Sequence, residues 1–425
     1  MLDIHYIVKN RDQIVEKLLS RGEANAEKLI VELINKNQAR RKLQLATDRL
    51  LEKLKKKTDE IGSLLKKKNQ AGAEQCKQAI KSLKLECKTL LQTLKELETN
   101  VQGRLLALPN LPHNQVPKGI NYTDNTIIRQ WPTSKKLPYT AKPHWELLNI
   151  YKLANFEQGN KITGAGFPVY HGKGARLQRG LINFFLDEAL AHNYQEVQPP
   201  LIVNKQAALG TGQLPDKENT MYTLQGEEMY LIPTAEVPVT NLYSHTILQE
   251  KDLPIKHVAY TPCFRQEAGS WGRHVRGFNR LHQFDKVELV QIQTPEASLL
   301  ALEEMCTYVT YLLEKLQLPY RVLKLCTGEL GFASALTYDV EVWSSGQKQW
   351  LEVSSISLFE TFQARRMQLR YRQGDEKHFC HTLNASALAL PRVMAALLEN
   401  FQTPTSLDLP HVLHAYVGFQ RIDKP

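Results

Sequence analysis

The stretch that decides the fold is 258–292, VAYTPCFRQEAGSWGRHVRGFNRLHQFDKVELVQI. Its first part, 258–265, has the apolar and aromatic content of a strand. Its last part, 281–292, mixes apolar and charged residues and suits a second strand. The segment between them, 269–277, holds three glycines and is typical of a loop. We therefore predict an antiparallel hairpin with a long connecting loop.

This hairpin is also rich in charge. Four arginines lie within sixteen residues and two glutamates accompany them: Arg265, Arg273, Arg276, Arg280, Glu267 and Glu288. Guanidinium groups match phosphate oxygens bidentately, so such a cluster favours a polyphosphate ligand. A solvated hairpin whose charges bind nothing would have the same composition, so composition alone leaves both interpretations open.

The order of the residues in this hairpin is more specific than its composition. CFRQEAGS followed by RGFNRLHQFDKVE resembles motif 2 of the class II aminoacyl-tRNA synthetases. The details FR.EAGS and HQF.K.E are those of the seryl-tRNA synthetases of bacterial type. The resemblance implies an enzyme that activates L-serine with ATP and transfers it to tRNA(Ser), and also to tRNA(Sec).

The resemblance implies roles for the residues of this motif. Arg265 would hold the serine carboxylate and the α-phosphate together, which is an electrostatic and positional contribution to catalysis. Gln266 and Glu267 would contact ATP, with Glu267 reading the adenine amino group and Phe278 stacking on the base. Glu288 would face the serine hydroxyl.

Two segments before the hairpin, TGQLPDKENTMYTL at 211–224 and YLIPTAEVPVTNLY at 230–243, also match seryl-tRNA synthetase patterns. By this resemblance Thr234, Ala235 and Glu236 line the serine site, and a carboxylate beside a hydroxyl can accept N–H donors of an ammonium group. Thr-Ala-Glu alone would be a surface turn by default.

Acidic residues alternate with apolar ones in the segment 338–372, as on a strand with one wet face. Carboxylates opposite a cluster of arginines suit a divalent cation placed between them and a phosphate. The resemblance implies ATP contacts at Glu352, Val353, Ser354 and Ser355. It implies a Mg²⁺ site at Glu352 and Ser355.

The segment 381–402, HTLNASALALPRVMAALLENFQ, predicts a strand followed by an apolar helix that carries Arg392. A single arginine in so apolar a helix is either a buried ion-pair partner or a ligand clamp. The segment resembles motif 3, which implies that Arg392 fixes the γ-phosphate and that Asn384 and Ser386 help to bind serine. Two glycines of a common family form are alanines here, at 385 and 387, which reduces backbone freedom in what we expect to be a loop near the amino acid.

The N-terminal quarter of the chain predicts a different structure. From about 28 to 104 there is no proline and no aromatic residue, and residues 28–105 hold 19 Lys and Arg against 9 Asp and Glu. In its second half, apolar or near-apolar residues recur in alternating steps of four and three, which is a heptad seam. These are Cys76, Ile80, Leu83, Cys87, Leu90, Leu94, Leu97 and Val101.

We predict from this pattern an antiparallel two-helix coiled coil with a turn at 69–72. Two lysine triplets, 55–57 and 66–68, lie near its tip. A lysine-rich face can serve solubility alone, so charge by itself favours RNA binding only weakly. The family resemblance implies that this arm grips tRNA.

These observations give an α+β chain: the antiparallel two-helix coiled coil, plus a class II synthetase antiparallel sheet flanked by helices. We expect an N-terminal tRNA-binding arm at 1–105, a proline-rich linker at 106–143 and a catalytic domain at 144–425. Residues 174–204 resemble motif 1, which implies a homodimer, although an ordinary packed helix and strand would have the same pattern.

The length, net charge and cysteine content of the whole chain fit this interpretation. The chain has 425 residues, a net charge of +10 and six cysteines without a CxxC pair, which favours reduced thiols in the cytoplasm over a zinc site or disulfides. We expect neither a signal peptide nor a membrane span. Two other functions stay open from the sequence: a catalytically silent synthetase paralogue that binds RNA, and a ligase that loads an amino acid onto a carrier protein.

Overall fold

The computed structural model describes residues 1–131, 140–216, 219–266 and 276–425. The chain forms two compact units, Leu2–Pro109 and Asn110–Pro425. We call the first the arm unit and the second the sheet unit. Within the described ranges no helix is both long and apolar enough to cross a membrane.

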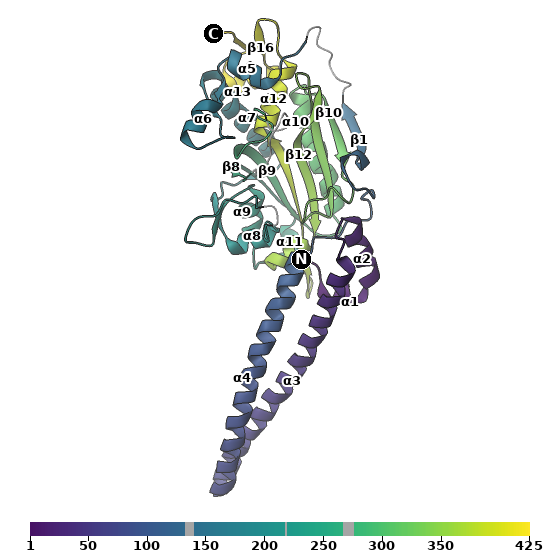
Figure 1. Cartoon of the computed structure of the whole chain (residues 1–425), viewed down its shortest axis with the longest axis vertical. Helices are drawn as coiled ribbons and strands as arrows, with labels where there is room; N and C mark the ends of the chain where they lie inside the picture. Colours follow the sequence, from purple (N-terminus) through teal and green to yellow (C-terminus); the bar gives the residue numbers. More distant parts are fainter. Residues whose placement is uncertain (132–139, 217–218, 267–275) are drawn as a thin grey trace. The chain divides into compact units, whose positions relative to one another are not determined.

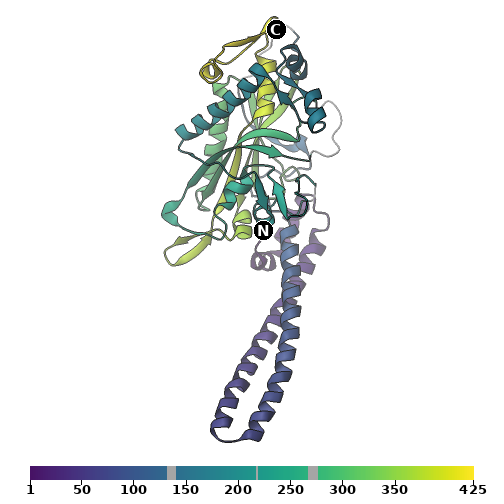
Figure 2. The same cartoon turned by 90° about the vertical axis from the view of Figure 1, so that its left-hand side faces the viewer.

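The arm unit is entirely helical. It contains α1 (Ile4–Lys9), α2 (Arg11–Ser20), α3 (Ala26–Lys66) and α4 (Gln70–Ala107). The helices α3 and α4 have 41 and 38 residues and run side by side, joined by a short turn that is visible in Figure 2. Asn69 caps α4, because its side chain accepts a hydrogen bond of 2.9 Å from the backbone N–H of Gly72. The turn therefore falls at 67–69, slightly before the predicted position.

The predicted coiled coil is confirmed, including its seam. Five of the eight seam residues of α4 are buried and the other three are half-buried, while their neighbours are mostly exposed. The ion pair between Arg104 and Glu32, at 2.7 Å, joins the two long helices at their base. The seam is narrow, as expected for two helices that bury only one stripe each.

The sheet unit is built on one eight-stranded sheet in the order β1-β10-β11-β12-β15-β9-β8-β4. Seven of these strands form antiparallel pairs with their neighbours, and only β4 runs parallel to β8. The strands are β1 (Thr126–Trp131), β4 (Gln195–Glu196), β8 (Ile255–Phe264), β9 (Gln283–Gln293), β10 (Tyr320–Lys324), β11 (Leu336–Ser344), β12 (Gln349–Glu360) and β15 (His381–Ala389). Figure 1 shows the central strands lying next to one another.

Helices and short strands complete the unit. The helices are α5 (His144–Ile150), α6 (Phe156–Ile162), α7 (Gly172–Ala191), α8 (Lys205–Thr211), α9 (Glu236–Asn241), α10 (Ser298–Lys315), α11 (Phe362–Met367), α12 (Leu390–Asn400) and α13 (His414–Val417). The minor strands are β2 (Ala154–Asn155), β3 (Val169–Tyr170), β5 (Ile202–Asn204), β6 (Met229–Leu231), β7 (Ile247–Gln249), β13 (Arg370–Gln373), β14 (Glu376–Phe379), β16 (Ser406–Asp408) and β17 (Arg421–Asp423).

The two faces of the large sheet differ in chemistry. On β9, Val287 and Leu289 belong to the main apolar core, which includes side chains of α7, α10 and α12. The alternate residues Lys286 and Glu288 point to the other face, as side chains two apart on a strand must. We call this second face the polar face. It carries the charged residues of the candidate site.

Two local predictions need correction. The range 106–143 was predicted to be a linker, but Thr126–Trp131 within it forms β1 and pairs with β10, because no proline interrupts those six residues. In the segment 174–204, which has the pattern of a helix followed by a strand, the strand that joins the large sheet has only the two residues of β4. The helix before it is present as α7.

Candidate active site

Two buried carboxylates lie on the polar face and share one amide. Glu288 of β9 is 1% exposed and Glu236, the first residue of α9, is 6% exposed. The side-chain nitrogen of Asn384 on β15 donates a hydrogen bond of 2.9 Å to each of them. Ser386, two residues along the same strand, lies 3.4 Å from the other oxygen of Glu288. Residues that are about 150 positions apart in sequence are therefore brought together here.

Glu236 titrates far from its ordinary range. Burial raises the pKa of Glu236 to about 7, and the charge of Glu288 acts in the same direction. The hydrogen bond from Gln363 of α11, at 2.6 Å, and the charge of Lys286 oppose this shift. A cationic ligand placed beside Glu236 would favour its charged form.

Sequence reasoning missed the role of Lys286. Its ammonium is nearly buried and lies 2.5 Å from Glu288 Oε2 and 2.8 Å from the hydroxyl oxygen of Thr234. It fixes both groups, and it supplies the opposite charge that a buried carboxylate requires. The alternation along β9 places Lys286 and Glu288 on one face and would have identified this residue.

Gln363 was missed as well. It is fully buried, donates to Glu236 and accepts a hydrogen bond of 2.7 Å from Thr382 of β15. Nothing in its sequence neighbourhood points to a ligand site, because its contacts are all to distant segments. Ala235, which was predicted with Thr234, directly precedes α9 and is buried in a cluster with Val290 and Ala259.

Arg265 follows the last residue of β8 and reaches over this group of side chains. Its Nε donates to the carbonyl of Pro233 at 3.3 Å, and its guanidinium lies 5.3 Å from the ring centre of Phe284. The register that pairs Phe284 with Cys263 puts this ring on the same face as Lys286 and Glu288. Phe284 is half-buried, so part of its ring is accessible.

Phe278 has a different environment from the one predicted for a base-stacking ring. It is 1% exposed and is stacked with Tyr170 and His144, at ring-centre distances of 5.4 and 5.8 Å. Its ring therefore belongs to the core. Of the two phenylalanines, Phe284 is the one with an accessible ring beside Arg265.

A β-bulge determines which residues of β12 face the polar side. The register pairs Asp339 with Ser355 and Glu341 with Glu352, with a shift between Val340 and Glu341. Without this bulge Glu352 and Ser355, three residues apart, would point to opposite faces. Because of it, both accompany Asp339 on the polar face.

The two residues between Glu352 and Ser355 have their side chains elsewhere. Val353 is part of the apolar core, and Ser354 is paired with Val340 and donates a hydrogen bond of 2.5 Å to the carbonyl of Ser386. Their predicted contacts with ATP can therefore involve only the backbone. The sequence motif did not reveal this, because the bulge is a tertiary feature.

Asp339 is the residue in this group with an unpartnered oxygen. Its Oδ1 is shielded from solvent and has no hydrogen-bond partner among the described residues. Burial, together with the negative charge of Glu352, holds the pKa of Asp339 well above its usual range. Glu341, by contrast, is satisfied by Arg321 at 2.6 Å and by Tyr122 at 2.7 Å.

This donor set fits a hard divalent cation. Mg²⁺ prefers carboxylate and hydroxyl oxygens and is often held by only one or two carboxylates, with substrate phosphates and water completing the shell. The unpartnered oxygen of Asp339 beside Glu352 and Ser355 is what such an ion would satisfy. In the described ranges no group of three or more His, Cys, Asp or Glu forms a complete protein site.

Arg392 of α12 adds a cationic group beside Glu352. Its guanidinium donates to the carbonyl of Glu352 at 2.8 Å and to the carbonyl of Asn279 at 3.1 Å, and it lies 3.5 Å from the Glu352 carboxylate. The side chain is 33% exposed, so its remaining N–H groups can reach a ligand. Arg392 is thus neither a fully buried ion-pair partner nor a surface charge.

Three predicted positions remain to be placed. Glu267 lies outside the described residues, while the backbone N–H of Gln266 bonds to the carbonyl of Thr220 at 2.7 Å. The segment with the two alanines at 385 and 387 is not a loop but part of β15. Both alanines are fully buried there, in extended backbone that does not need glycine.

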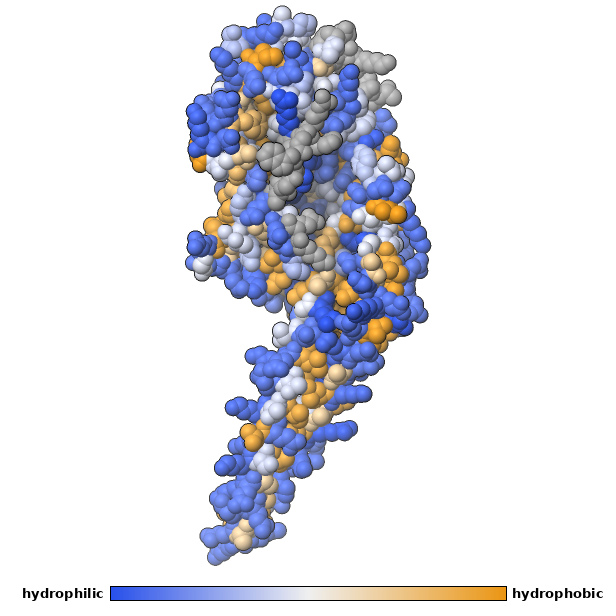
Figure 3. Space-filling view, viewed as in Figure 1, coloured by the Kyte–Doolittle hydropathy of each residue, from blue (hydrophilic) through white to orange (hydrophobic). Residues whose placement is uncertain are grey.

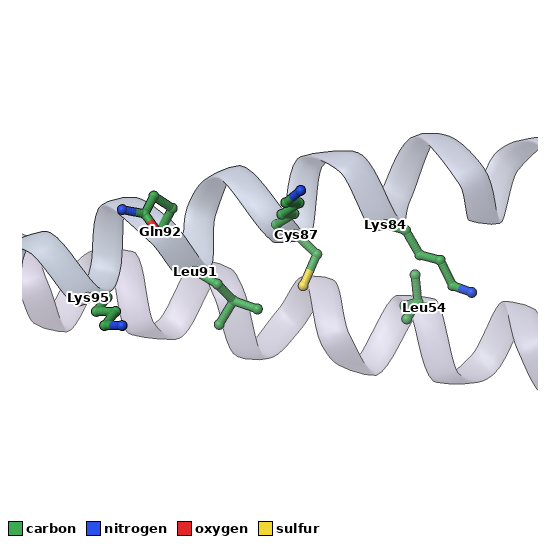
Figure 4. Close-up of a pocket in the computed structure, with 7 residues that line it drawn as sticks. Leu54, Lys84, Cys87, Leu91, Gln92 and Lys95 are labelled. Atoms are coloured by element: carbon green, nitrogen blue, oxygen red, sulfur yellow. The ribbon is translucent and has the colours of Figure 1, made fainter.

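The arm unit offers a second surface. Lys66, Lys67 and Lys68 are exposed at the tip of α3, and Figure 3 shows hydrophilic side chains along the arm beside a narrower apolar strip. A shallow groove of about 390 Å³ lies between α3 and α4. Figure 4 shows its lining, which combines three lysines with apolar side chains, a thiol and an amide: Leu54, Lys84, Cys87, Lys88, Leu91, Gln92 and Lys95.

Comparison with known proteins agrees with both units. Residues 1–112 match the seryl-tRNA synthetase N-terminal domain, and residues 221–401 match the tRNA synthetase class II core domain (G, H, P, S and T). The chain is 46% identical to a serine-tRNA ligase of Akkermansia muciniphila over 98% of both chains. It is 51% identical to one of Salinibacter ruber over 77% of this chain and 78% of that one.

A solved structure extends the comparison to the fold. The seryl-tRNA synthetase of Pyrococcus horikoshii, in complex with ATP, superposes over 100% of both chains with a TM-score of 0.93 and 33% identity. The family domains, the relatives and this structure agree over nearly the whole chain. The chain therefore belongs to the seryl-tRNA synthetases, the class II ligases that attach serine to tRNA.

Proposed function

We propose that the polar face binds L-serine and ATP side by side and catalyses both steps of serine attachment. In the first step a serine carboxylate oxygen attacks the α-phosphorus of ATP, and the bond to the β-phosphate oxygen breaks to release pyrophosphate. In the second, a hydroxyl of the terminal ribose of tRNA(Ser) attacks the carbonyl carbon, and AMP leaves. No protein nucleophile is needed, because each substrate supplies its own.

The observation that carries this proposal is the pair of carboxylates bridged by Asn384. We assign Glu236, with Thr234 beside it, to the serine ammonium, and Glu288, with Asn384 and Ser386, to the serine hydroxyl. An amino acid without the hydroxyl would leave these buried polar groups unpaired, which is the strong form of selectivity. Threonine carries the hydroxyl, so its exclusion must come from the space around the extra methyl group.

Arg265 and Arg392 are the proposed cationic contacts of the nucleotide. Arg265 would bridge the serine carboxylate and the α-phosphate, where charge develops during the reaction. Arg392 would hold the γ-phosphate at the other end of the chain of phosphates. For the base we keep Glu267 and Gln266 as predicted contacts, and the exposure of the two rings favours Phe284 over Phe278 as the stacking partner.

We assign the Mg²⁺ that accompanies ATP to Glu352, Ser355 and Asp339. When bound, the ion would neutralise phosphate charge and fix the triphosphate in one conformation. The residues themselves place two carboxylates and a hydroxyl on one face, and the bulge in β12 is what brings them together. Support for this part is the unpartnered oxygen of Asp339 described above.

We propose that the arm is the part of the enzyme that binds tRNA. Lysines on long helices suit contacts to the RNA backbone and to helix shape, which carry little base information. Recognition of shape would admit a second acceptor, tRNA(Sec), and we propose it as a further substrate.

We further propose that the enzyme is a homodimer that works in the cytoplasm. Leu190, Leu201 and Ile202 are large apolar side chains with 44%, 36% and 41% exposure in the segment that resembles motif 1, as a subunit interface requires. All six cysteines lie in the described part of the chain as free, buried thiols, which suits a reducing compartment.

The deciding experiment is ATP–pyrophosphate exchange with each of the twenty amino acids. Serine should support rapid exchange, and alanine should be slower by about 10⁴-fold, as for other sites built around a substrate hydroxyl. Rapid exchange with an amino acid that lacks a hydroxyl would overturn the assignment of Glu288 and Asn384. No exchange with any amino acid would favour the silent paralogue, and exchange without charging of tRNA would favour the carrier-protein ligase.

A further inference from the structure

A further buried acid, Glu399, lies in the sheet unit outside the proposed serine and ATP contacts. His144, at the start of α5, and Glu399, near the end of α12, are both fully buried. Their side chains form a hydrogen bond of 2.8 Å between Nδ1 and Oε1. The backbone N–H of His144 donates to the same oxygen at 2.8 Å.

Glu399 holds the turn between β11 and β12 with its other oxygen. That oxygen accepts hydrogen bonds from the hydroxyl of Ser344 and, at 2.9 Å, from the backbone N–H of Gly346. Burial alone would raise the pKa of Glu399, but its hydrogen bonds from His144 and Ser344 outweigh burial and lower it. The carboxylate is therefore a fixed anionic anchor for several segments.

His144 transmits this anchoring to the end of the hairpin loop. Its Nε2 accepts a hydrogen bond of 2.8 Å from the backbone N–H of Phe278. Because Nε2 is an acceptor, the ring proton is on Nδ1 and is donated to Glu399. Gly277 permits this approach: its φ is +65°, and a Cβ there would lie 2.4 Å from His144 Nε2.

The next residue, Asn279, connects this anchor to Arg392. The Asn279 side chain donates to Gln347 at 2.8 Å, and Gln347 in turn donates to Glu399 at 3.1 Å. The carbonyl of Asn279 accepts the 3.1 Å hydrogen bond from Arg392 Nε. Arg392 and Glu399 are seven residues apart on α12, which is two turns on the same side of the helix.

We propose that the His144–Glu399 pair positions the triphosphate contact of the enzyme. It fixes residues 277–279 so that the carbonyl of Asn279 holds the Arg392 guanidinium in the direction of the nucleotide. His144 is then a positioning residue that acts through the backbone of Phe278 and Asn279, without touching substrate. This inference rests on the proposed role of Arg392 in ATP binding.

Two substitutions of His144 separate positioning from simple core stability. His144→Gln keeps an acceptor near the position of Nε2, for Phe278, whereas His144→Asn keeps a donor near the position of Nδ1, for Glu399. We expect His144→Asn to raise the KM for ATP about tenfold in serine-dependent pyrophosphate exchange, a loss of one ordinary hydrogen bond. His144→Gln should stay within about twofold of the wild type, and the KM for serine should be unchanged in both.

Stability is followed in parallel by thermal unfolding. Tyr243→Phe is the matched control, because it removes a partly buried hydrogen bond of 2.6 Å to His257 in the same unit and leaves residues 277–279 and Arg392 unchanged. It should lower the unfolding temperature and leave the KM for ATP unchanged. If His144→Asn behaves like this control, or if His144→Gln impairs ATP binding as much as His144→Asn does, the proposal is wrong.

A third variant keeps the test decisive if His144→Asn does not fold. Gln347→Ala removes the hydrogen bonds that join Asn279 to Glu399 through Gln347 but keeps the His144–Glu399 hydrogen bond, and it should also raise the KM for ATP. A wild-type KM for ATP in Gln347→Ala would overturn the positioning role. If the wild-type protein shows no exchange at all, the proposed function itself fails, which is a separate result.

Discussion

The arm unit and the sheet unit use burial for opposite purposes. Along α4 the buried side chains are apolar or thiol groups in one stripe, and the charged side chains of this helix are exposed or half-buried. On the polar face of the sheet the buried groups include Glu236, Lys286 and Glu288, each at most 6% exposed. The first arrangement stabilises a rigid rod, while the second keeps charged groups ready for a ligand at some expense in stability. Variants of the two units should therefore fail in different ways.

The largest effect is expected from Arg265→Ala. Removing the guanidinium that would stabilise the developing charge should lower kcat/KM for serine-dependent pyrophosphate exchange by about 10³-fold. The unfolding temperature should change little, because the side chain is half-buried and has one backbone hydrogen bond. Normal exchange in this variant would break the proposed reaction geometry.

The KM for serine should depend on pH through the buried carboxyl of Glu236, and the variant Glu236→Gln tests this dependence. The carboxyl has a pKa of about 7, so it is protonated below that pH and charged above it. A serine ammonium binds the charged form. In the wild type the KM for serine should therefore rise about tenfold for each pH unit below about 7 and level off above it.

The same variant should lose this dependence. Its KM for serine should be about 10- to 100-fold above the wild-type value at high pH, because a charge-assisted hydrogen bond contributes about 1.5–3 kcal/mol. The measurement is KM for serine as a function of pH in the exchange assay. Identical pH profiles for the two proteins would assign the ammonium site to another group.

Replacing charged residues of the arm should affect only tRNA charging and its salt dependence. Replacing Lys66, Lys67 and Lys68 by Gln should lower kcat/KM for tRNA charging about tenfold or more, and reduce the slope of its logarithm against log salt by about two to three. Serine activation should be unchanged. A matched triple variant at Lys251, Lys377 and Lys424, which are exposed on the sheet unit, should leave both steps as they are.

If the control variant on the sheet unit lowers tRNA charging as strongly as the variant at the tip of the arm, the arm is not the main tRNA-binding surface. The comparison also tests how far the excess of positive charge on residues 28–105 matters. Only lysines that meet phosphates should contribute to the salt slope, because the slope counts displaced counterions.

The two phenylalanines should give the smallest and most specific difference. Phe284→Ala should raise the KM for ATP about tenfold, because stacking of a base on an aromatic ring contributes about 1–3 kcal/mol. Phe278→Ala should instead lower the free energy of unfolding by about 3–5 kcal/mol, as expected for a buried aromatic side chain. Chemical denaturation and exchange kinetics on both variants test this difference. If Phe278→Ala raised the KM for ATP and Phe284→Ala only lowered stability, Phe278 would be the base contact.

The seam of α4 could be predicted residue by residue from the sequence. A coiled coil depends on a local period, so the positions from Cys76 to Val101 were sufficient to define its seam. The hairpin of β8 and β9 was also predictable, because strand, glycine-rich loop and strand follow one another in the chain.

The site was predictable only in part. Residues in motifs, such as Arg265, Glu288 and Asn384, could be proposed from the sequence because their order in the chain is distinctive. Lys286 and Gln363 were missed, because their importance comes from contacts across strands and helices. The ring of Phe278 was assigned to the base by its place in the motif, whereas its environment depends on how α5 and β3 fold against it.

Val353 is the extra residue of the bulge in β12, because it has no partner in the pairing with β11. Deleting that single codon would restore an even ladder in which Glu352 and Ser355 are two residues apart and still share the polar face with Asp339. The bulge is therefore needed only because two residues, Val353 and Ser354, separate Glu352 from Ser355. A redesign that straightens β12 but keeps both of these residues would instead turn Glu352 to the apolar side and separate the metal-facing residues.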